Sequence, residues 1–85
     1  MTTVNTDQET KLKQASVFIR TMRVVAIHTA DACTSGDLTP RETAAILTAL
    51  ADEMLVLSQA MREGRHIPST NIAESDAVNR LAEIA

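Results

Sequence analysis

The stretch Leu38–Gly64, LTPRETAAILTALADEMLVLSQAMREG, decides the fold of this chain. It opens with Thr39–Glu42, which supplies an N-cap hydroxyl, a proline for the first helical position and a glutamate that completes a capping box. It closes at Gly64, because glycine readily takes the left-handed conformation that ends helices. We therefore expect one helix over about 40–63. A mostly apolar stripe follows it in alternating steps of four and three residues, at Thr43, Leu47, Leu50, Met54, Leu57 and Met61.

The segment before this stretch predicts a second, longer helix. Thr6–Glu9 has the form of another capping box, and the helical pattern continues to Thr34, so we expect a helix over about 6–34. Gly36 lies in the short break between the two helices, and so short a connection makes them antiparallel neighbours. Heptad-like steps of three and four residues again mark its stripe, at Leu12, Ala15, Ile19, Met22, Ala26, Thr29 and Cys33.

The remaining residues predict a connection and a short third helix. His66–Asn71 contains proline and small polar residues and is expected to be a loop. Apolar residues then return with helical spacing, which predicts a helix over about 72–85. No strand-like alternation or internal repeat competes with this pattern. The sequence therefore predicts one all-α domain over 1–85, a helical bundle of two long antiparallel helices and a short C-terminal one.

Composition excludes several classes of protein. The 85 residues carry a net charge of −3, are 45% hydrophobic and include one phenylalanine but no tryptophan or tyrosine, unlike a disordered chain or a β-sheet protein. The single Cys33 cannot form an intrachain disulfide. Met1–Gln14 is too polar for a secretion signal, and charged residues interrupt the apolar stretch Ala15–Cys33. We therefore expect a cytoplasmic protein that does not associate with a membrane.

The expected helix lengths favour a homodimer. Helices over 6–34 and 40–63 would be roughly 42 and 36 Å long, whereas a compact chain of this size has a radius of gyration of about 12 Å. A hairpin this elongated covers only one side of each stripe, and a two-fold-related copy would complete the core. The alternative is a monomeric three-helix bundle. The residues predicted to form the core or dimer seam are Leu12, Ile19, Met22, Leu47, Leu50, Met54, Leu57 and Met61.

The first long helix also carries a second apolar strip on its back, interleaved with arginines. We predict that this outer strip binds a partner protein, with aliphatic groups supplying desolvated area and arginines supplying charge-assisted hydrogen bonds. The alternative is that the third helix or a dimer partner covers it. The residues of the outer strip are Val17, Arg20, Arg23, Val24 and Ile27.

No arrangement of residues predicts a reaction or a bound cofactor. On a helix, His28 and Cys33 differ by about 140° and Asp52 and Glu53 by about 100°, so neither pair converges on a metal ion or a substrate. His66 supplies no further ligand at a diagnostic spacing. We expect no metal, cofactor, catalytic residue or small-molecule substrate, and hence no enzyme.

Charge distribution bears on the remaining functional classes. Residues 1–28 carry four basic and two acidic groups, a charge of +2, whereas 29–85 carry −5. We do not expect this acidic chain to bind nucleic acid first of all, since it lacks stacking aromatics and a dense basic stripe. We expect a protein–protein interaction module that masks or bridges a partner, such as an inhibitor, antiactivator or adaptor encoded by a phage or mobile element. The alternatives are a nucleic-acid accessory protein using the basic face of the first helix, and a purely structural dimerisation module.

Overall fold

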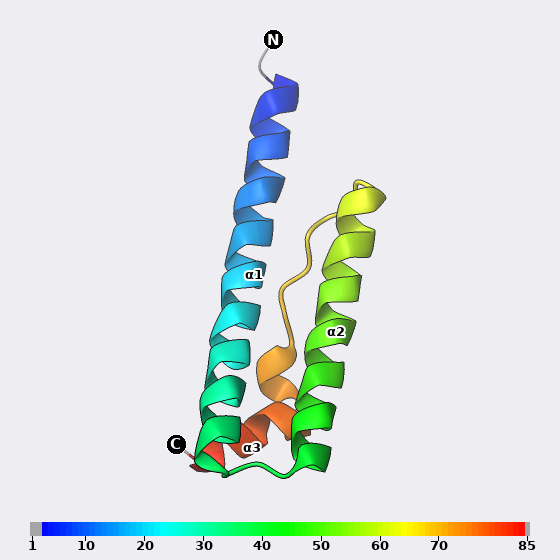
Figure 1. The fold of residues 1–85 in the computed structure, drawn as a ribbon. Helices are drawn as coiled ribbons and strands as arrows, with labels where there is room; N and C mark the ends of the chain where they lie inside the picture. The colour runs from blue at the N-terminus through cyan, green and yellow to red at the C-terminus, as the bar shows by residue number, and fades with distance from the viewer. Residues whose placement is uncertain (1–2, 85) are drawn as a thin grey trace.

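The protein is an all-helical hairpin with a C-terminal segment folded back against one side. The computed structural model describes residues 3–84, with side chains from Asp7 onward. Helix α1 spans Thr3–Ser35, α2 spans Pro40–Arg62, a 3₁₀ turn η1 spans Ile72–Glu74 and α3 spans Asp76–Ile84, and this part of the chain contains no strand. Figure 1 shows α1 and α2 running antiparallel. The predicted all-α class with two long helices is confirmed.

Both ends of α2 lie close to where its capping residues predict them. The Thr39 hydroxyl accepts from the Glu42 backbone N–H at 3.1 Å, and the Glu42 carboxylate accepts from the Thr39 N–H at 2.9 Å. At the other end Gly64 has φ of 67°, and Arg65 N–H donates to the Ala60 carbonyl at 2.8 Å. The α1–α2 turn uses the same device, with Gly36 at φ 77°. The capping residues at the two ends of α2 therefore predict its bounds.

Two predicted helix boundaries are wrong. Helix α1 already begins at Thr3, so Thr6 lies inside the helix rather than at its N-cap. No proline or glycine precedes Thr6 to stop the helix from extending further. The C-terminal helix expected over 72–85 is instead broken into η1 and α3, because Ser75 is extended, with φ −69° and ψ 129°.

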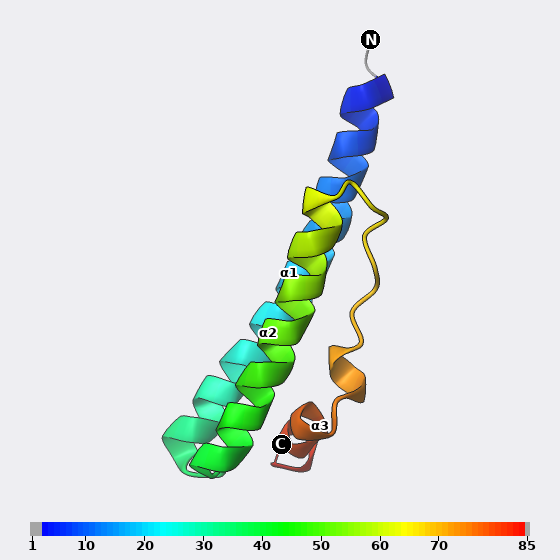
Figure 2. The ribbon, with the colours of Figure 1, turned by 90° about the vertical axis from the view of Figure 1, so that its right-hand side faces the viewer.

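The core lies between the hairpin and the C-terminal segment. Ile46, at the centre of this packing, has no exposed surface. The connector, residues 63–71, and η1 bring Ile67 and Ile72 to the same core, and α3 adds Leu81. Figure 2 shows the connector, η1 and α3 together on one side of the hairpin. The buried apolar residues are Ala15, Phe18, Met22, Val25, Ala32, Ile46, Leu57, Ala60, Ile67, Ile72 and Leu81.

Two carboxylates on α2 tie the C-terminal segment to the hairpin. Glu53 Oε1 accepts from the Thr70 hydroxyl at 2.5 Å and from the Asn71 N–H at 2.8 Å. Glu42 Oε2 accepts from Arg80 Nε at 2.7 Å, while its other oxygen serves the N-cap. The Thr39 N–H and the Arg80 guanidinium together hold the pKa of Glu42 below its ordinary value of 4.5. Glu42 therefore joins the start of α2 to α3.

This contact predicts an acid-sensitive part of the folding stability. Because the pKa of Glu42 is lowered in the folded state, its contribution is fully present above pH 4.5 and is lost as the pH falls through the lowered pKa. Glu42→Gln keeps an acceptor for the cap but removes the charge that faces Arg80. We expect this variant to be less stable at pH 7 and to lose less stability on acidification, as measured by urea unfolding from pH 7 to acid. Glu74→Gln, at a carboxylate without a described ion pair, should keep the natural acid slope; equal slopes for the natural chain and Glu42→Gln would contradict the assignment.

Candidate protein-interaction surfaces

The side of the hairpin opposite α3 is not covered by any other element that the structure describes. Figure 2 shows α3 and the connector on one side of α1 and α2 only. On the uncovered side, five large apolar side chains from both helices remain 40–60% exposed. We call this surface the open face. Its exposed residues are Leu12, Ile19, Leu47, Met54 and Met61.

The open face arises because the heptad stripe of each helix is only half covered. On α1, Ala15, Met22 and Thr29 point into the core and are buried. The alternate positions Leu12 and Ile19 point out of it, at 60% and 46% exposure. The same alternation on α2 places Leu57 inside at 4% and Met54 outside at 43%. Of the eight residues predicted for the seam, Met22 and Leu57 are thus buried, Leu50 is half-buried and the other five form the open face.

Shallow hollows run along the open face, and both helices line each of them. One lies between Ile19 of α1 and Met54, Leu57 and Met61 of α2, with Ser58 and Arg62 also lining it. Its neighbour lies between Ile19, Met22 and Ala26 of α1 and Leu50 and Met54 of α2, with Arg23 at its edge. A third lies near Leu12 and Met61 and is also lined by Ile67 of the connector. The first two hollows share Ile19 and Met54, so they adjoin one another between the two helices.

The outer strip is also exposed. Val17 is 63% exposed, Val24 53% and Ile27 46%. The third helix does not cover them, since α3 packs near Ala32 with Leu81 and Ile84. Arg20 and Arg23 form no hydrogen bond or ion pair with any side chain that the structure describes. Arg23 also borders a hollow of the open face, so the two surfaces meet along α1.

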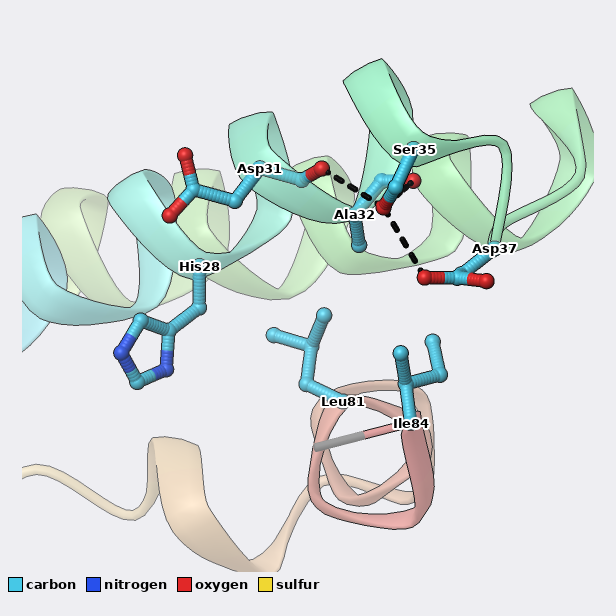
Figure 3. A pocket seen from close by; sticks show the side chains of 7 residues that line it. All are labelled: His28, Asp31, Ala32, Ser35, Asp37, Leu81 and Ile84. Carbon is cyan, nitrogen blue, oxygen red and sulfur yellow. Dashed lines mark hydrogen bonds between the residues drawn. The ribbon is translucent and has the colours of Figure 1, made fainter.

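A small pocket lies between the C-terminal end of α1 and α3 (Figure 3). Leu81 and Ile84 form its apolar side, and His28 and Asp31 lie at its rim. The Ser35 hydroxyl lies 2.9 Å from Asp37 Oδ2 and 3.0 Å from the Asp31 carbonyl oxygen. Its proton is therefore donated to an acceptor at the end of α1 or in the α1–α2 turn. No hydrogen bond joins His28 to another described side chain, and a nucleophile paired with a base is therefore not formed here.

The other titratable residues considered in the sequence do not converge either. Cys33 is exposed and its sulfur lies 3.5 Å from the Thr43 hydroxyl. Glu53 is engaged with the connector, while its neighbour Asp52 is exposed. Among the described residues no group of three or more His, Cys, Asp or Glu side chains is placed to hold a metal ion. The open face and the outer strip are therefore the candidate functional surfaces of the described chain.

Helix α2 is also the most apolar segment of the chain. By length and composition alone, Pro40–Arg62 is long and apolar enough to cross a membrane, and only a minor part of it is buried. The sequence interpretation weighed only Ala15–Cys33 for this role and overlooked α2. Asp52 and Glu53 lie near the middle of α2, and Glu53 holds the connector beside it.

Comparison with protein-family models, with curated proteins and with solved structures finds no match for this chain.

Proposed function

We propose that this chain is a non-catalytic protein–protein interaction module that acts by occupying, masking or bridging a surface of another protein. The observation that carries the proposal is the open face, where five large apolar side chains of two helices stay 40–60% exposed. Contiguous apolar patches of this kind on small proteins mark interaction sites. The proposed setting is the cytoplasm, with no cofactor, metal or small-molecule substrate involved.

The proposal includes a homodimer formed through the open face. The radius of gyration is 15.3 Å, against about 12 Å for a compact chain of this length. The accessible surface is 5964 Å², whereas a compact 9.2-kDa monomer has roughly 4,900 Å². The excess of about 1,000 Å² supports an assembly in which part of this surface is covered.

The outer strip is the proposed contact for a different partner protein. Val17 and Val24 provide exposed aliphatic area one heptad apart. Arg20 and Arg23, which form no ion pair with a described side chain, flank it. A matching surface would be apolar in its centre and carry carboxylates at its edge, because arginine forms its strongest contacts with carboxylates. A dimer that displays two such strips would bridge two partner molecules or bind one of them bivalently.

A protein partner fits α2 better than a membrane does. A membrane-spanning α2 would place Asp52 and Glu53 deep in hydrocarbon and would separate Glu53 from Thr70 and Asn71. A partner that covers only the open face leaves both carboxylates where they are. The apolar content of α2 is therefore assigned to a protein interface.

One observation favours nucleic acid as a second candidate partner. Lys13, Arg20 and Arg23 on α1 are exposed and have no ion pair among the described residues. Such binding would weaken steeply with added salt, and substitution of these residues would reduce the slope of that dependence. If the chain were instead a purely structural dimerisation module, a pull-down from its native cell would recover only further copies of the chain.

The role of the outer strip predicts the behaviour of Val17→Asp combined with Val24→Asp. Because both side chains are more than half exposed, at 63% and 53%, we expect unchanged helical circular dichroism and a change in unfolding free energy of about 0.5 kcal/mol or less per site. We also expect loss of a heterologous partner in pull-down from the native cell, followed by mass spectrometry. Leu55→Asp, at a 53% exposed position of α2 away from both surfaces, is the matched control and should retain that partner. Unchanged capture by the double variant would remove the outer strip as a docking surface.

The homodimer predicts that thermal stability depends on protein concentration. A dimer gains about 1.4 kcal/mol per tenfold concentration, which for two chains of this size raises Tm by about 3–6 °C. Met54→Asp places a charge in the open face and should abolish the dependence, as measured by circular dichroism melting over a hundredfold range. Leu55→Asp introduces the same charge one residue away, outside the open face, and should preserve it. If both variants melt alike, the open face is not the interface.

A further inference from the structure

The dimensions of the open face fit a second hairpin of this same chain. The 23 residues of α2 extend about 35 Å, and the molecule is 18 Å wide, so the face measures roughly 600 Å². Two such faces in contact bury about 1,200 Å² in total, at the lower end of stable interfaces. A single helix, about 10 Å in diameter, would cover only about half of this width.

The exposed heptad positions supply the register for such a partner. Leu12 shares a hollow with Met61, and Ile19 shares two with Met54, so each pair lies at one level of the hairpin. Helices with alternating three- and four-residue steps pack best against helices with the same period. A second copy of the chain supplies its own α1 and α2, which are antiparallel and match the first copy's helices in length and period. It therefore completes a four-helix bundle around the exposed side chains.

A two-fold axis pairs two open faces in only two ways. An axis along the helices places α1 of one copy against α2 of the other, with equivalent levels side by side. An axis across the helices places α1 on the partner's α1 and α2 on the partner's α2. In both arrangements neighbouring helices run antiparallel, so helix direction does not distinguish them.

The charges at the edge of the open face distinguish them. On α1, Arg23 borders the hollow next to Ile19 and has no ion pair with a described side chain. Arg23 lies near the midpoint of the stretch of α1 that runs beside α2, between the Leu12 and Cys33 ends. An axis across the helices would therefore bring Arg23 close to the partner's Arg23, so that two like charges lie side by side at the edge of the interface.

The arrangement along the helices avoids this conflict. At the level of Arg23 the corresponding edge of α2 carries small, uncharged residues, spaced one heptad apart: Ala44, Ala51 and Ser58. The cation of this edge, Arg62, lies about three turns from Ala51, near the Gly64 end of α2. The aliphatic stem of Arg23 can lie over such residues while its guanidinium reaches water. Leu47 of α2 would meet the partner's small Ala26 at the same level, which suits interdigitated packing.

We infer that two copies dock through their open faces about an axis along the helices, so that α1 of each lies against α2 of the other and Ile19 faces the partner's Met54. This inference rests on the proposed homodimer and adds its geometry. The interface is then built from layers, each with one α1 and one α2 residue from both copies. Disruption of either helix stripe disrupts both halves of the interface.

Disulfide capture between different chains tests this arrangement. All variants carry Cys33→Ser, which removes the natural thiol and leaves a hydroxyl beside Thr43. Chains with Ile19→Cys are mixed with chains with Met54→Cys, exchanged under reducing conditions and then oxidised. We expect a mixed disulfide dimer about ten times more abundant than that from mixing Leu47→Cys with Met54→Cys chains, because only the first pair approaches disulfide distance. Leu12→Cys mixed with Met61→Cys repeats the test in another layer.

Two outcomes distinguish a wrong dimer geometry from the absence of a homodimer. Each mixture is first measured by sedimentation under reducing conditions, and circular dichroism verifies its helical content. A folded monomer at every concentration removes the proposed homodimer and this geometry together. A dimer that cross-links through Leu47→Cys and Met54→Cys, and not through the first pair, overturns the geometry while the homodimer stands.

Discussion

The structure depends on a hydrophobic stripe that the described elements of this chain cover only in part. In α1 and α2 the heptad positions alternate between the core and the open face, so that Met22 and Leu57 are buried while Ile19 and Met54 remain largely exposed. Both sets belong to one pattern in the sequence and have the same apolar chemistry. The partly covered stripe explains the elongated shape, the excess of accessible surface and the proposed second copy at once.

The C-terminal segment decides which side of the hairpin stays open. Glu53 holds Thr70 and Asn71, and Glu42 holds Arg80, so the connector and α3 are fixed to the same side. Ile67, Ile72 and Leu81 then fill that side of the core. The described part of this segment, which ends at Ile84, lies on that side only (Figure 2). The two polar tethers thus determine where an interaction surface remains.

Much of this arrangement could be predicted from local sequence. The capping box at Thr39–Glu42 and the turn glycines fix the ends of α2, and the stripe fixes which residues of each helix are apolar. The periodicity does not reveal which half of the stripe α3 covers, since Leu57 and Met54 look alike in sequence. The pairing of Glu53 with Thr70 and Asn71, 17 and 18 positions away, has no local signal in the sequence. The extended Ser75 that breaks the last helix has none either.

Sedimentation equilibrium of the natural chain is the most direct test of the claim that a partner hairpin covers the open face. Over about 1–100 μM protein, the account predicts a mass that approaches twice the 9.2 kDa of one chain. It also predicts that the mass falls back toward a single chain on dilution, because the estimated interface is small. A mass of 9.2 kDa throughout that range would contradict the account.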